Sequence, residues 1–81
     1  MPRSTHSPRQ TRLQELLSSR RIAAGLTQDQ VARRLRRPQS FVSKYELGER
    51  RLDVIELIEV SDALGIDPCK LIKELITIRQ G

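Results

Sequence analysis

Hydrophobic residues recur along this chain at intervals of three and four positions, which is the spacing of amphipathic α-helices. No segment alternates apolar and polar residues between hairpin signals, so the pattern predicts no strand. Signals that begin and end helices divide the chain into five segments. The sequence therefore predicts an all-α fold, a compact bundle of five short helices joined by short loops.

Most of the predicted helices begin at a capping residue and end close to a glycine. Thr27 with Gln30, and Asp53 with Glu56, have the spacing of capping boxes, and Arg36-Arg37-Pro38 interrupts the helical pattern. We expect helices from Ser7-Pro8 to Gly25, from Thr27 to about Leu35, over about residues 39–47, from Asp53 to Gly65, and from Asp67-Pro68 onward.

The same spacing predicts which side chains are buried. The expected core positions in the first four helices are Leu13, Leu16, Leu17, Ala24, Val31, Ala32, Leu35, Phe41, Val42, Tyr45, Val54, Leu57, Ile58 and Leu64. In the fifth helix Cys69 is expected to be a small buried residue rather than a redox-active thiol.

Hydrophobic residues on the fifth helix spread over about half of its circumference, which is more than one neighbouring layer needs. The surplus predicts a two-fold dimer interface, with Leu57 or Val60 nearby, formed by Leu71, Ile72, Leu75, Ile76 and Ile78. The alternative is that these residues complete the core of the domain itself.

The composition excludes several classes of protein. A chain of 81 residues forms one domain with one modest core. The single cysteine excludes an internal disulfide and a multi-cysteine metal site, and it fits a cytoplasmic protein. We expect no signal peptide, because the first ten residues are polar and basic, and no membrane span, because no apolar run is long enough to cross a bilayer. One histidine and no paired acids beside a nucleophile argue against an enzyme, and we expect no metal or cofactor.

Charge is unevenly distributed along the chain. Residues 1–51 contain twelve Lys or Arg and four Asp or Glu, a net charge of +8, whereas residues 52–81 contain three and six, a net charge of −3. A basic first half favours a polyanionic partner, although a solvated basic surface is the simpler alternative.

The third predicted helix has two chemically distinct faces. On a helical wheel its aromatic residues and Val42 point inward, and the opposite arc contains Gln39, Ser40, Ser43, Lys44 and Leu47. Amide, hydroxyl and ammonium groups form hydrogen bonds with base edges, so this arc predicts base contacts in a major groove. The alternative is an ordinary solvated helix face. Phe41 and Tyr45 are expected to anchor the core, with the Tyr45 hydroxyl near enough to the edge to reach a phosphate. The candidate phosphate contacts are Gln28, Arg33, Arg34, Arg36, Arg37, Arg50 and Arg51.

The segments GLTQDQVARRL and QSFVSKYELGERR resemble the lambda-repressor-like helix-turn-helix family of the Xre type, over about residues 13–75. The resemblance implies a five-helix bundle whose second and third helices form the DNA-reading unit. It places Gln28, Gln39, Ser40, Ser43 and Lys44 toward DNA and Arg50 and Arg51 on phosphates. It also implies an ion pair between Arg21 and Glu46, which would brace the third helix against the first.

Two positions at the turn differ from the family pattern. Arg36 stands where glycine is usual, and Arg37 stands where a small apolar residue is frequent. We expect a positive φ at Arg36, at a cost of about 1 kcal/mol. A contact between its charge and DNA would offset that strain.

These observations predict a sequence-specific transcriptional regulator, with a repressor as the simplest form, that binds double-stranded DNA as a homodimer. Two reading helices about 34 Å apart would meet successive major grooves of a near-palindromic site. The alternative is a protein-interaction module such as an antitoxin, whose last helix binds an unknown partner protein. We expect residues 1–7 to form a flexible basic arm and residues 8–81 the helix-turn-helix domain. Arg3, Arg9 and Arg12 either add non-specific DNA contacts or have no role, and His6 has no expected metal role.

Overall fold

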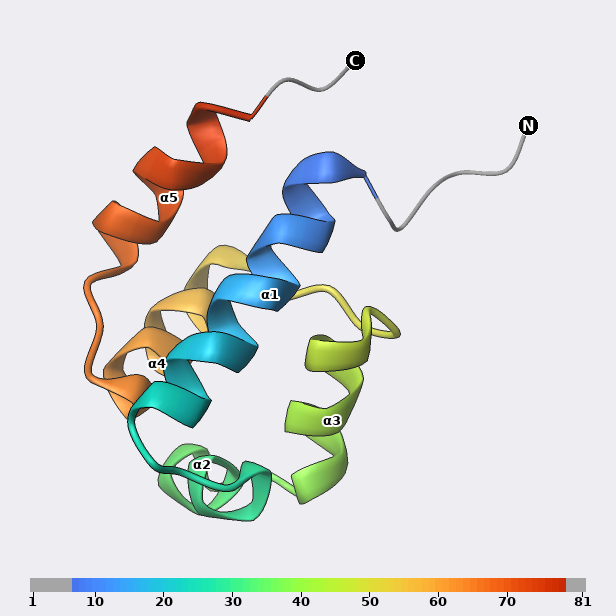
Figure 1. Ribbon diagram of the computed structural model, residues 1–81. Helices are drawn as coiled ribbons and strands as arrows, with labels where there is room; N and C mark the ends of the chain where they lie inside the picture. Colours follow the sequence, from blue (N-terminus) through green and yellow to red (C-terminus); the bar gives the residue numbers. More distant parts are fainter. Residues whose placement is uncertain (1–6, 79–81) are drawn as a thin grey trace.

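Five α-helices joined by short loops make up residues 7–78, the part of the chain that the computed structural model describes (Figure 1). They are α1 (Pro8–Ala23), α2 (Gln28–Leu35), α3 (Gln39–Leu47), α4 (Val54–Leu64) and α5 (Pro68–Ile76). The predicted all-α bundle of five helices is confirmed, and its boundaries lie within two residues of those expected. Most of the predicted basic arm, with Arg3 and His6, lies outside the described residues.

The helix starts follow the predicted capping chemistry. The Ser7 hydroxyl accepts a hydrogen bond from the Gln10 amide, and Thr27 and Gln30 form a complete capping box at the start of α2. Asp53 and Glu56 form a second capping box, in which each side chain accepts a hydrogen bond from the other residue's backbone N–H. These contacts satisfy N–H groups that have no partner within the helix.

Every helix contributes side chains to one central core, in which α1 packs against α3 and α5 while α2 packs against α3 and α4 (Figure 1). The buried apolar residues are Leu16, Leu17, Val31, Ala32, Phe41, Val42, Tyr45, Leu57, Val60, Ala63, Leu64 and Leu71. The predicted inward face of α3 is confirmed, since Phe41, Val42 and Tyr45 are all buried. The core therefore holds α3 by one side and leaves the other side in solvent.

Four expected core positions are exposed, and these predictions were wrong. Val54 is 69% and Ile58 is 42% exposed, while Ala24 and Cys69 are also on the surface. Buried side chains of α4 instead follow Leu57, Val60 and Leu64, because that stripe faces the other helices. Hydrophobic residues three and four positions apart predicted a helix here, but this spacing did not show which of two neighbouring stripes of the helix faces the core.

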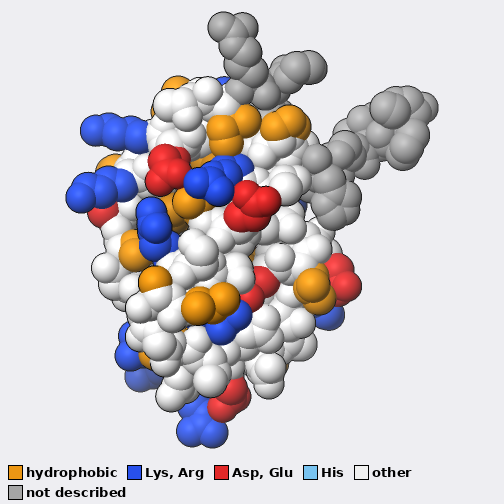
Figure 2. Space-filling view, in the orientation of Figure 1, with side chains coloured by type: hydrophobic (Ala, Val, Ile, Leu, Met, Phe, Trp, Pro, Cys, Tyr) orange, Lys and Arg blue, Asp and Glu red, His pale blue; other side chains and the backbone are white. Residues whose placement is uncertain are grey.

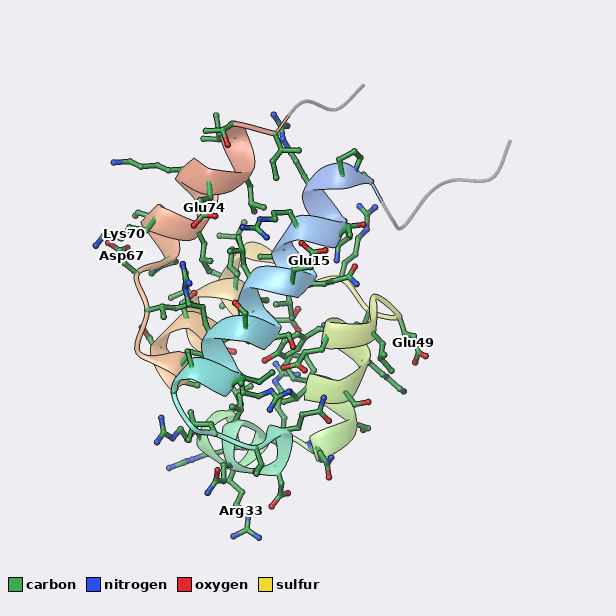
Figure 3. All side chains as sticks on the ribbon, viewed as in Figure 1. Glu15, Arg33, Glu49, Asp67, Lys70 and Glu74 are labelled. Atoms are coloured by element: carbon green, nitrogen blue, oxygen red, sulfur yellow. The ribbon has the colours of Figure 1, made fainter. Side chains whose placement is uncertain are left out.

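Polar contacts fasten the two terminal helices to each other. The Arg9 guanidinium donates hydrogen bonds to the carbonyl oxygens of Leu75 (3.0 Å) and Ile78 (3.2 Å) at the C-terminal end of α5. Glu74 lies on the side of α5 facing α1, within 3.5 Å of Arg12 and 3.6 Å of Arg20 (Figure 3). Arg9 and Arg12, which we grouped with the basic arm, are thus part of the folded domain. The position of Arg9 is favourable because a cation stabilises the C-terminal end of a helix.

Candidate nucleic-acid interface

The corner between α2 and α3 is a tight turn centred on Arg36. Arg36 has φ 58° and ψ 43°, so the predicted positive φ is confirmed. The Arg37 N–H donates to the carbonyl oxygen of Ala32 (3.0 Å), and Pro38 then directs the chain into α3. Ala32 is completely buried, which allows α2 and α3 to approach closely. The turn places the exposed face of α3 next to the arginines of the corner.

The outward face of α3 has the composition expected from the sequence. Gln39, Ser40 and Lys44 are exposed and Ser43 is half-buried, so each side chain reaches the surface. Leu47, at the end of the helix, is 62% exposed. In Figure 2 the surface over α3 is largely uncharged, whereas Lys and Arg side chains lie mostly along the opposite edge and beside α2. The face therefore offers hydrogen-bonding groups without acidic side chains among them.

The ring of Tyr45 lies in the core rather than at the edge of this face. Tyr45 is 2% exposed, its hydroxyl is buried, and its ring meets Phe41 edge to face with 5.5 Å between ring centres. Burial raises the pKa of the Tyr45 hydroxyl, because the phenolate would lose its hydration. The suggested contact between this hydroxyl and a phosphate is wrong, since the hydroxyl is not accessible.

An ion pair between Arg21 and Glu46 joins α1 to the last turn of α3. Arg21 Nε lies 2.8 Å from Glu46 Oε2, and Arg21 Nη2 lies 3.1 Å from Oε1. Arg21 Nη1 also donates to the carbonyl oxygen of Leu26 in the loop after α1. The hydrogen bond to Glu46 raises the pKa of Arg21. Since both side chains are largely buried, the pair fixes where α3 lies relative to α1.

Gln28 takes part in the same network. Its Nε2 donates to Glu46 Oε1 (3.0 Å), and its Oε1 accepts from Gln39 Nε2 at 3.4 Å. The start of α2 is thus linked to both ends of α3. We expected Gln28 at a phosphate; the structure places its side-chain amide between Glu46 and Gln39, beside the surface of α3.

The arginines near the corner fall into two groups. Arg36 and Arg51 are exposed, and Arg33 points away from the domain below α2 in Figure 3, where it pairs with Asp29 at 3.0 Å. Arg34 donates to the carbonyl oxygen of Ala63 at the end of α4 (2.8 Å).

The other group, Arg37 and Arg50, lies against Glu56 and the ring of Phe41. From the sequence both arginines were expected at phosphates and Glu56 was expected only to cap α4. Their association was not predicted, because spacing along the chain does not show that the Glu56 side chain lies against both arginines. The one available signal was an acidic residue six positions after Arg50.

The predicted dimer surface on α5 needs a correction. Leu71 is 2% exposed and Leu57 and Val60 are also buried, so these three residues belong to the core. Leu75 packs against that core and Ile78 is half-buried, whereas Ile72 and Ile76 are exposed, Ile76 by 65%. On α4, which packs against α5, Val54, Ile55 and Ile58 are exposed as well. The exposed apolar surface on α5 is therefore smaller than expected, and α4 also has exposed apolar side chains.

Two further features of residues 7–78 bear on the class of protein. None of the helices in this range combines the length and the hydrophobicity that a membrane span requires. Within the same range, no group of three or more His, Cys, Asp or Glu side chains is placed to hold a metal ion.

Comparisons with known proteins agree with the geometry. The helix-turn-helix family profile matches residues 17–71. A solved structure of an Xre-family-like protein from Pseudomonas syringae pv. tomato str. DC3000 is similar at 50% sequence identity, with a TM-score of 0.81 over 86% of this chain and 88% of that chain. A search of curated proteins gave no significant match. With α2, the turn at Arg36 and α3 in this arrangement, the chain belongs to the helix-turn-helix family of the Xre type.

Proposed function

We propose that this protein is a sequence-specific transcriptional regulator that reads double-stranded DNA with α3 in the major groove. Membership of the family points to a DNA-binding regulator, a class that is typically not enzymatic. The observation that carries the proposal is the exposed face of α3, with its amide, hydroxyl and ammonium groups held outward by a buried Phe41, Val42 and Tyr45. These groups match the donors and acceptors on base edges.

Base and backbone contacts have separate roles in this proposal. Gln39, Ser40, Ser43 and Lys44 contact base edges, because they project from the exposed side of α3. Arg36 and Arg51, exposed on either side of α3, contact phosphates, and Gln28 contributes beside Gln39. Phosphate contacts set affinity and register, and base contacts set the preferred sequence.

The protein acts as a homodimer in this account. The exposed residues Ile72 and Ile76 of α5, with Leu75 and Ile78 at the edge, support a two-fold contact to which Ile55 and Ile58 of α4 contribute. Burying such side chains stabilises an assembly by about 25 cal/mol for each Å² of apolar surface removed from water. A two-fold dimer would place two reading helices about 34 Å apart on a near-palindromic site. Occlusion of a promoter by this dimer is the simplest mechanism of repression.

Selection of bound duplexes from a random DNA library tests the proposal. The expected result is a consensus of two inverted half-sites whose centres lie about 10 base pairs apart, or a multiple of that spacing. Binding without any enriched sequence would contradict sequence-specific reading. A single half-site without its inverted copy would contradict the dimer and leave reading by α3 intact.

One observation favours a second candidate, an interaction module such as an antitoxin whose last helix binds another protein. The exposed isoleucines of α5 and α4 would serve such a partner equally well. Stoichiometric co-purification of a second protein that is lost in an Ile76→Asp variant would favour this candidate. The face of α3 argues for DNA, since its exposed groups before Leu47 are polar.

A further inference from the structure

Four side chains, each from a different segment, meet beside α3. They are Arg37 of the α2–α3 turn, Phe41 of α3, Arg50 of the following loop and Glu56 of α4. The Cζ atoms of Arg37 and Arg50 lie 4.4 Å and 4.9 Å from the centre of the Phe41 ring. We refer to these four residues as the Glu56 cluster. Two residues predicted to bind phosphates are thus engaged by the same carboxylate and the same ring.

Glu56 is itself held in place. Its Oε1 accepts a hydrogen bond from the Asp53 N–H (3.0 Å), and its own N–H donates to the Asp53 carboxylate (2.7 Å). Glu56 is buried although it is charged, and the cations beside it compensate for the lost hydration. The carboxylate is therefore a fixed anchor at the start of α4.

The guanidinium group of Arg50 forms two hydrogen bonds with the Glu56 carboxylate. Its Nη1 lies 2.9 Å from Glu56 Oε1 and its Nη2 lies 2.7 Å from Oε2, while Nη1 also donates to the Arg51 carbonyl oxygen (3.0 Å). A bidentate pair of this kind fixes orientation as well as distance. If Arg50 bound a phosphate with the same two N–H groups, the buried carboxylate of Glu56 would lose both of these hydrogen bonds.

Arg37 completes the arrangement from the other end of α3. Its Nη2 lies 3.7 Å from Glu56 Oε2, with Glu59 Oε1 at 4.0 Å. Both guanidinium groups contact Phe41, whose ring is buried near the start of α3. The residues before and after α3 are in this way connected to α4 through one ring and one carboxylate.

We propose that Arg37 and Arg50 are positioning residues, which set the orientation of α3 on the domain through Glu56 and Phe41 instead of binding phosphates. This inference rests on the proposed reading of DNA by α3. It explains why Arg37 and Arg50 share an acidic partner, since an arginine that only binds phosphates needs no carboxylate beside it. It assigns Glu56, whose side chain is buried, an effect on which sequence is preferred.

In the competing role Arg37 and Arg50 bind phosphates, and pairing with Glu56 keeps them from the phosphates until DNA is bound. The two roles predict opposite effects of Glu56→Gln. Removal of the carboxylate charge would free the arginines for phosphates and tighten binding to every duplex. In the positioning role the same change loosens α3 and weakens only the preferred sequence. Gln at this position keeps the capping box, so the start of α4 is retained.

The experiment measures affinity for the selected duplex and for a random-sequence duplex over a series of salt concentrations. The variants are Glu56→Gln, Arg50→Lys, which keeps the charge but loses the bidentate fork, and their double variant. Arg51→Gln is the matched control, since it removes a neighbouring arginine outside the cluster. Thermal unfolding of each variant checks that the protein is folded.

We expect Glu56→Gln and Arg50→Lys each to lower the preference for the selected duplex by about tenfold, which corresponds to about 1.4 kcal/mol. Affinity for the random duplex and the slope of log affinity against log salt should remain unchanged, and the double variant should be no worse than either single variant. Arg51→Gln should weaken both duplexes equally and reduce the slope by about one.

Tighter binding of Glu56→Gln to both duplexes would overturn the positioning role. A full preference retained by both Glu56→Gln and Arg50→Lys would also overturn it, with the proposed function intact. If either variant is unfolded, the other decides the question by the same criteria. A wild-type protein that binds both duplexes equally would instead overturn the proposed function, and the positioning role with it.

Discussion

Arg21 of α1 and Glu46 of α3 form an ion pair with two hydrogen bonds, and both side chains are largely buried between the helices. Glu46 also accepts from Gln28 of α2, so one carboxylate is shared by the three helices nearest the candidate interface. Its side chain is only 7% exposed. Because a buried charge without a partner is costly, this pair should control the position of α3 as well as stability.

Arg21→Met should lower the free energy of unfolding by about 3 kcal/mol, because Glu46 then remains buried without its cation. The double variant Arg21→Met with Glu46→Met should recover most of that loss, since neither charge remains to be buried. Chemical denaturation of the three proteins measures both values. A double variant as unstable as the single one would show that the cost comes from lost packing instead.

Arg36→Gly should stabilise the protein by about 1 kcal/mol, because glycine adopts a φ of 58° without strain. Its affinity for DNA should nevertheless fall at low salt, since a phosphate contact is lost. Arg36→Ala is the control, as it removes the charge but keeps the strained backbone. Denaturation and DNA titration test the two effects separately. A stabilised Arg36→Gly variant with wild-type affinity would show that the charge does not offset the strain through DNA.

Stability at acid pH should depend on Glu56. Its pKa is lowered from 4.5 to about 2, mainly by the hydrogen bonds from Arg50 and then by the one from the Asp53 N–H. A lowered pKa means that the carboxylate stabilises the fold above about pH 4.5, and that this contribution is lost between there and about pH 2. Wild type should therefore be more stable than Glu56→Gln at pH 6, with the difference shrinking to near zero at pH 2. Thermal unfolding across this range would contradict the assignment if the difference did not change with pH.

The proposed dimer depends on the exposed isoleucines of α5. Ile76→Asp should convert the protein to a monomer at tens of micromolar, because a buried aspartate without a partner costs several kcal/mol. Ile22→Asp on α1 is a matched control, since Ile22 is 64% exposed and lies outside the proposed interface. Analytical ultracentrifugation without DNA gives the oligomeric state. A wild-type protein that is already monomeric at this concentration would contradict the dimer.

Local chemistry made much of the fold predictable. Capping boxes at Thr27 and Asp53 depend on residues three positions apart. The positive φ of Arg36 was expected from the family resemblance, in which glycine is usual at this position of the turn. The outward face of α3 was predictable because its aromatic residues and its polar residues lie on opposite arcs. Each of these features is determined within a few residues of the chain.

Features that depend on tertiary contacts were not predictable in the same way. Ile58 and Leu57 are both apolar and adjacent, and only the packed neighbours of α4 decide that Leu57 is buried and Ile58 is not. The contact of Arg50 with Glu56 depends on how the loop after α3 folds back. Helical spacing predicts which residues share a face, but it does not show what that face meets.

The central claim is that the exposed side chains of α3 read base edges, and Lys44 tests it most directly. Selection from a random DNA library should be done with wild type and with Lys44→Ala, followed by affinity measurements on the wild-type consensus. The account predicts a loss of about 1–3 kcal/mol on that consensus and relaxed preference at one base pair in each half-site. An unchanged consensus, with equal losses on specific and random DNA, would show that Lys44 reads no base and would contradict the claim.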